Sequence, residues 1–85
     1  MVKGKTSTGF SFVISDSAIN NMELLDALGS LDSNPLYMGR VLSLLLGERQ
    51  KKKLYDHVRA KDGTVPQDKI GDEIMEIFKT KPVKN

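Results

Sequence analysis

Residues 33–47 constrain the fold of this chain more than any other stretch, because they predict a helix with apolar side chains on most of its sides. Their sequence is SNPLYMGRVLSLLLG. Asn34 suits the N-cap, Pro35 fits the first helical position, and Gly47 is placed to end the helix. A helix that is apolar nearly all round has to be covered by other elements. We therefore expect this helix at the centre of the fold.

The length of the chain allows one core around that helix. The chain has 85 residues, of which 39% are hydrophobic, and it has no cysteine. A chain of this size forms one domain, and disulfides or thiolate metal sites cannot support it. We predict a single compact domain over residues 1–79 and a flexible tail over residues 80–85. The predicted class is α+β, with an N-terminal β-hairpin (residues 1–15) packed on a bundle of about four short helices (residues 20–79).

The predicted hairpin has the sequence VKGKTSTGFSFVI, residues 2–14. A three-residue loop favours a residue with positive φ at its end, and Gly9 provides it. Strand alternation then places Phe10, Phe12 and Ile14 on one side. A two-residue loop would instead set Lys5 opposite Phe12, so we prefer the first register. Because a lone hairpin is marginal in water, its apolar side must rest on helices.

Three further helices are predicted around the central one, over about residues 20–31, 48–60 and 66–79. Their apolar stripes are Leu24, Leu28 and Leu31, then Leu54, Tyr55 and Val58, then Ile70, Ile74 and Ile77, with Met75 and Phe78 beside the last stripe. Asp16 and Ser17 could begin an extra turn before the first of these helices. A turn at Asp62-Gly63 separates the last two.

No pattern in the sequence indicates catalysis or metal binding. His57 is the one histidine, and its neighbour Asp56 does not share a helix face with it. No second histidine or cysteine could complete a metal site, and the glycines form no phosphate-binding loop. We interpret His57 as a surface or boundary residue and expect a protein that is not an enzyme and needs no cofactor.

The stretch RQKKKLYDHVRAKDG, residues 49–63, raises the question of nucleic-acid binding. Its basic side chains spread around the predicted helix, and only Arg49 and Gln50 are suited to reading base edges. The acidic residues 62–78 follow closely, so we favour a solvated helix face that also meets an acidic neighbour. We do not expect nucleic acid to be the partner. Whether residues 49–53 have a functional role is left open.

The hydropathy pattern predicts a cytoplasmic protein. The longest apolar run, VLSLLLG, is far shorter than the roughly 20 residues that span a bilayer. The amino terminus has lysines but lacks the apolar stretch of a signal peptide. We therefore expect no association with membranes.

The sequence LLDAL…LLLGERQKKKLYDHVR…DGTVP…EIMEIF resembles the small tail assembly chaperones of long-tailed phages and prophages of Gram-positive bacteria. The resemblance covers nearly the whole chain and consists of packing and turn signatures. It implies a cytoplasmic, non-catalytic protein that binds a helical, tape-measure-like client during tail building. Self-association is left open. The alternative is a prophage-encoded regulator that binds DNA or a host protein.

A chaperone of a long amphipathic helix needs an exposed apolar strip or groove. The central helix and the last helix carry more apolar side chains than one small core would easily cover. We predict partner contacts at Leu42, Leu45, Met75 and Phe78. The alternative interpretation is that these side chains fill a tight core.

Overall fold

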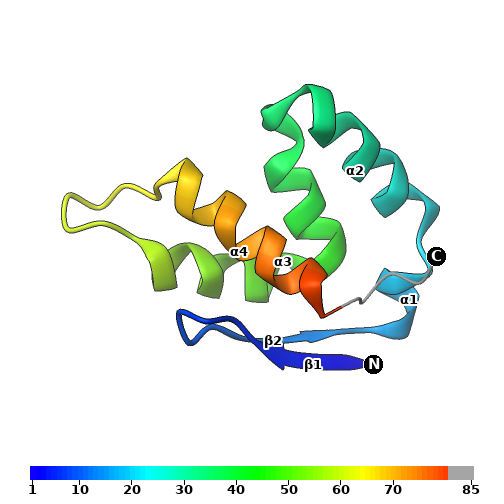
Figure 1. The fold of residues 1–85 in the computed structure, drawn as a ribbon, viewed down its shortest axis with the longest axis horizontal. Coiled ribbons are helices and arrows are strands. Elements are labelled where there is room, and N and C mark those ends of the chain that lie inside the picture. The colour runs from blue at the N-terminus through cyan, green and yellow to red at the C-terminus, as the bar shows by residue number, and fades with distance from the viewer. Residues whose placement is uncertain (81–85) are drawn as a thin grey trace.

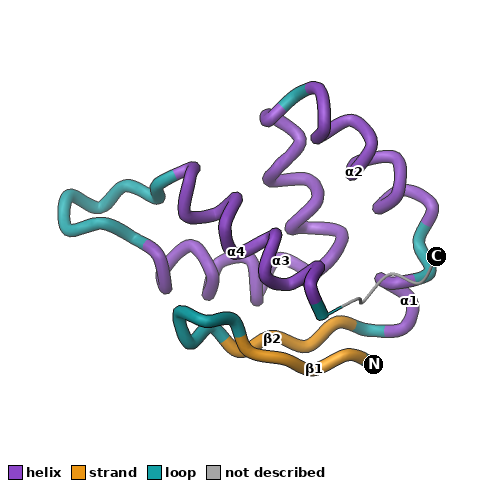
Figure 2. The backbone as a smooth tube through the Cα atoms, viewed as in Figure 1, coloured by secondary structure: helices purple, strands orange, loops and turns teal. Residues whose placement is uncertain are grey.

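The computed structural model describes residues 1–80, and over these residues the chain forms a two-stranded hairpin, four α-helices and one 3₁₀ turn (Figures 1 and 2). In chain order the elements are β1 (Val2–Lys5), β2 (Ser11–Ile14), α1 (Asp16–Ile19), α2 (Met22–Ser33), η1 (Pro35–Tyr37), α3 (Met38–Val58) and α4 (Gln67–Lys79). The predicted α+β class is confirmed. Apart from Thr80, the predicted flexible tail lies outside the described residues.

The hairpin has the predicted loop and register. Val2 pairs with Ile14 and Gly4 pairs with Phe12. The loop closes where the Gly9 amide donates to the carbonyl of Thr6 at 3.0 Å, with Gly9 at a φ of 95°. Gly4 has to be small, because a Cβ there would lie 2.6 Å from the Cζ of Phe12. The Phe12 ring therefore lies over the β1 backbone.

The regular helix breaks at Gly47, the residue that was expected to end it, and a second helical segment of α3 follows directly. Gly47 has a φ of 80° and a ψ of 164°, a region open in practice only to glycine. It bends α3 into two segments, residues 38–46 and 48–58, which Figure 1 shows running in different directions. The predicted cap is confirmed, since the Asn34 side chain accepts from the Leu36 amide at 3.1 Å. The first turn is 3₁₀, and the α-helix begins at Met38.

The helix predicted over residues 20–31 is α2, and a separate short helix, α1, precedes it. The Ser15 side chain caps α1 by accepting from the Ala18 amide at 3.1 Å. The Asn21 side chain caps α2 by accepting from the Glu23 amide at 3.0 Å. Each cap satisfies an amide that has no partner within its helix. The extra turn expected near Asp16 is thus α1.

One core joins all of these elements. The hairpin lies along one side of the molecule, α3 and α4 cover its apolar face, and α2 packs beside the first segment of α3 (Figure 1). The buried apolar residues are Phe10, Phe12, Ile14, Leu24, Ala27, Val41, Leu42, Leu45, Leu46, Leu54, Ile70, Ile74 and Ile77. The predicted inner faces of the hairpin and of α4 are therefore correct.

Candidate protein-binding surface

Two of the four predicted partner contacts lie in the core. Leu42 is 0% exposed and Leu45 is 1% exposed. Both lie on the side of α3 that packs into the shared core, so neither can touch a partner in this structure. The prediction is wrong for these two residues because a helix that is apolar nearly all round does not indicate which side remains uncovered.

The other two predicted contacts lie at or near the surface of α4. Met75 is 64% exposed, and Phe78 is half-buried against the edge of the core. A Cβ on Gly71 would lie 3.9 Å from the Cε of Met38, so this side of α4 faces the start of α3. Met75 follows Gly71 by four residues and therefore lies on the same side. Met38, Met75 and Phe78 thus follow one seam between α3 and α4.

The most exposed large apolar side chain near this seam is Leu36, at 87%. It belongs to η1, where the Asn34 cap and Pro35 fix the first turn before α3. Leu36 borders an open pocket of about 300 Å³ between η1, α3 and the start of α4, which we call the Leu36 pocket. Its lining residues are Pro35, Leu36, Met38, Gly39, Tyr55, Val65, Gln67 and Ile70.

We group Leu36, Met38, Gly71, Met75 and Phe78 as the Leu36 strip. The part of it on α4, from Gly71 to Phe78, covers about 10 Å at the rise of an α-helix. That length matches about two turns of a second helix. Sequence reasoning missed Leu36. The available signal was its position directly after the Asn-Pro cap, where the first turn precedes the buried stripe.

The basic stretch of α3 contributes to one wall of the Leu36 pocket. The Lys51 ammonium donates to Ser43 Oγ at 2.8 Å and lies 5.8 Å from the ring centroid of Tyr55, which lines the pocket. Arg59 pairs with Asp56 at 2.9 Å within the same helix. Within residues 1–80 this stretch forms no ion pair with α4, and its ion pairs are with acidic residues of α3 itself, Glu48 and Asp56.

The acidic residues of α4 hold the hairpin loop instead. Glu73 is 2% exposed, and its two carboxylate oxygens accept from the hydroxyls of Thr6 and Thr8, each at 2.9 Å. Three residues further along α4, Glu76 accepts from the Ser7 hydroxyl at 2.9 Å. We call Thr6, Thr8, His57 and Glu73 the Glu73 cluster.

His57 belongs to this cluster and lies at the surface. Its Nε2 is 3.1 Å from Thr8 Oγ1, and its ring lies 5.7 Å from that of Phe10. Because the Thr8 proton is directed to Glu73, Thr8 Oγ1 is the acceptor and His57 Nε2 is the donor. The hydroxyl protons of Thr6 and Thr8 are thus both used in fixing the loop to α4. His57 is the boundary residue that the sequence predicted, now with a defined structural contact.

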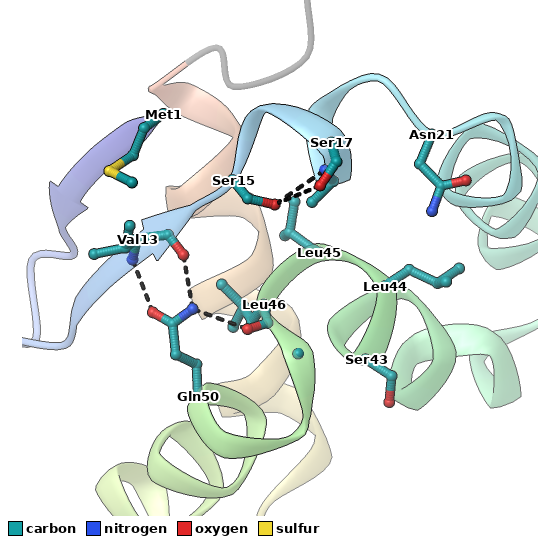
Figure 3. A pocket seen from close by; sticks show the side chains of 12 residues that line it. Met1, Val13, Ser15, Ser17, Asn21, Ser43, Leu44, Leu45, Leu46 and Gln50 are labelled. Atoms are coloured by element: carbon teal, nitrogen blue, oxygen red, sulfur yellow. Dashed lines mark hydrogen bonds between the residues drawn. The ribbon is translucent and has the colours of Figure 1, made fainter.

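A second pocket, of about 430 Å³, lies between β2, α1 and the bend of α3 (Figure 3). The Gln50 amide closes one side of it. Its Oε1 accepts from the Val13 amide at 2.8 Å, and its Nε2 donates to the carbonyls of Val13 at 2.7 Å and Leu46 at 2.8 Å. Gln50 therefore binds β2 as a neighbouring strand would. We interpret this pocket as part of the joint between the hairpin and α3.

Residues 1–80 contain no group of three or more side chains placed to hold a metal ion. Over the same range, no helix combines the length and apolar character needed to cross a membrane. Comparison with protein-family models finds no matching family, and comparisons with curated proteins and with solved structures find no match either.

Proposed function

We propose that this protein is a non-catalytic tail assembly chaperone that binds an apolar-faced helical segment of a tape-measure-like client in the cytoplasm. The observation that carries the proposal is Leu36, an apolar side chain that is 87% exposed beside an apolar-lined pocket. The resemblance of the sequence to such chaperones supplies the class of client.

The Leu36 strip has the properties that helix recognition needs. An amphipathic helix docks by placing side chains at i, i+3, i+4 and i+7 in an apolar groove. The Leu36 pocket has room for one such side chain, Leu36 offers exposed apolar surface at the pocket, and Met75 offers more on α4. Burying that surface is favourable by roughly 25 cal/mol per Å². Met38 and Met75 add flexible side chains that adapt to different clients.

The test is to place a charge on the strip and follow client binding. Leu36→Asp and Met75→Asp should each weaken binding of the client segment by about tenfold or more, which corresponds to roughly 1.4 kcal/mol. Met22→Asp is the matched control, because Met22 is 67% exposed on α2 and lies outside the strip. Calorimetry with purified client segment should show a negative heat-capacity change and a weak dependence on salt.

Co-expression gives the second readout. The intact chaperone and Met22→Asp should keep the client soluble, whereas Leu36→Asp should not, with all three chaperones folded by circular dichroism. Equal loss with Met22→Asp and Leu36→Asp would contradict the strip. Tight, sequence-selective binding to duplex DNA that disappears with Lys52→Gln and Lys53→Gln would favour the regulator instead.

A further inference from the structure

The two outer edges of the hairpin differ in their hydrogen bonding. Near the loop, the Thr6 amide donates to the Phe10 carbonyl at 2.9 Å, so Thr6 faces β2. Backbone direction alternates along an antiparallel strand, so the N–H and C=O groups of Lys3 and Lys5 face outward from β1. On β2, the backbone groups of Val13, which lies opposite Lys3, also face outward. The hydrogen bond from the Val13 amide to the Gln50 side chain agrees with this direction.

The outer edge of β1 remains open within the described residues. Gln50 satisfies both backbone groups of Val13 on β2, whereas no hydrogen bond in residues 1–80 reaches the outward groups of Lys3 or Lys5. The core side of β1 is open as well. Val2 and Gly4 are half-buried, while their β2 partners are fully buried. Both features are those of a sheet that lacks its next strand.

We propose that the outer edge of β1 binds an extended acidic segment of a partner protein as a third strand. Lys3 and Lys5 are exposed on the solvent face, and neither forms an ion pair within residues 1–80. In an added antiparallel strand, the residues that exchange hydrogen bonds with Lys3 and Lys5 place their side chains beside the two ammonium groups. Carboxylates fit those positions. The alternate residues lie beside Val2 and Gly4, where apolar side chains fit.

A second copy of this chain is a poorer occupant of the edge. Pairing β1 with another β1 would set lysine against lysine, which is destabilising across a strand pair. The outer edge of β2 is already taken at Val13 by Gln50. Edge lysines also hinder indiscriminate strand pairing, so they select an acidic segment rather than any extended chain.

The experiment uses the intact protein and a synthetic peptide of alternating Glu and Val. Titration should shift the amide resonances of Lys3 and Lys5 and slow their hydrogen exchange by about tenfold or more as the edge becomes occupied. Two N-methylated peptides provide the control. Methyl groups on the Glu nitrogens, which face β1, should abolish binding, whereas methyl groups on the Val nitrogens should leave it unchanged.

Charge reversal gives an independent readout. The double variant Lys3→Glu/Lys5→Glu should no longer bind the Glu-Val peptide and should bind a Lys-Val peptide instead. Leu36→Asp should bind the Glu-Val peptide as the intact protein does, which separates this edge from the Leu36 strip. Equal binding of both methylated peptides, no binding at millimolar peptide, or shifts confined to the Leu36 strip would each overturn the proposal. Concentration-dependent protection of Lys3 and Lys5 without peptide would overturn it in favour of a second copy.

Discussion

Glu73 is buried and Leu36 is exposed, which is the reverse of what is usual for a charged and an apolar side chain. The Glu73 side chain is 2% exposed, whereas Leu36 is 87% exposed. Contacts within the chain explain the burial of Glu73, because the hydroxyls of Thr6 and Thr8 satisfy both oxygens of its carboxylate. Nothing in the packing of residues 1–80 explains the exposure of Leu36. The difference separates a residue used to build the fold from a residue available to another molecule.

Burial of a carboxylate is costly unless its oxygens are hydrogen-bonded. In the Glu73 cluster the bonds come from a loop at the opposite end of the sequence, so the same contacts join the hairpin to α4. The exposed Leu36 side chain has no comparable role in joining elements of the fold. Removing Glu73 should therefore change stability, whereas removing Leu36 should change binding.

Among the changes at Glu73, Asp62 and Leu36, the largest expected loss of stability is that of Glu73→Ala. It leaves the buried hydroxyl of Thr6 without its carboxylate acceptor, which should cost about 1–3 kcal/mol of unfolding free energy. Glu76→Ala is the matched control on the same helix, since Glu76 bonds Ser7 at the surface and should cost at most about 1 kcal/mol. Urea melts measure both. Equal losses for the two variants would remove the distinction between buried and exposed carboxylates.

A smaller, pH-dependent effect is expected at Asp62. The Thr64 hydroxyl and amide donate to Asp62 Oδ1 at 2.7 and 3.0 Å, and these bonds lower the pKa of Asp62 below its ordinary value of 3.8. Its contribution is therefore complete above pH 3.8 and is lost as the pH falls through the lower folded-state pKa. Asp62→Asn keeps an acceptor oxygen that does not titrate. The difference in melting temperature between the two proteins should change only under acidic conditions, and a difference that is constant from neutral to acidic pH would contradict this.

The smallest expected effect on stability is that of Leu36→Ser. An exposed side chain outside the core should change the unfolding free energy by no more than about 0.5 kcal/mol. Leu24→Ser, at a leucine that is 0% exposed, is the contrasting variant and should be severely destabilising. A loss above about 2 kcal/mol for Leu36→Ser would place that residue in the core and end the comparison.

Local signals explain why most of the fold could be predicted from the sequence. Gly9 and the alternation of Phe10, Phe12 and Ile14 determine the hairpin register, since a shift by one residue would expose all three. Asn34 and Pro35 mark the start of the central helical region for similarly local reasons. The break at Gly47 was also predicted, but the angle between the helical segments before and after it could not be, because that angle depends on a single pair of dihedral angles.

The candidate surface was harder to predict because it depends on contacts far apart in the sequence. Thr6 and Glu73 are separated by 67 residues, and no motif in the sequence around either residue predicts their contact. Leu42 and Leu45 look as available as Leu36 in the sequence, and only the packing of other elements around α3 covers them. Met75 was correctly placed at the surface because it lies outside the stripe of Ile70, Ile74 and Ile77.

The bend at Gly47 has a consequence for how the chain closes on itself. A straight helix with the 21 residues of α3 would be about 31 Å long. The molecule measures 38 × 27 × 20 Å, so such a helix would be longer than its two smaller dimensions. A residue that straightened α3 would carry residues 48–80 away from their own hairpin. The apolar face of that hairpin could then be covered by the same segment of another molecule, which is the arrangement of a domain-swapped dimer. The backbone turn at Gly47 therefore directs residues 48–80 back onto their own hairpin.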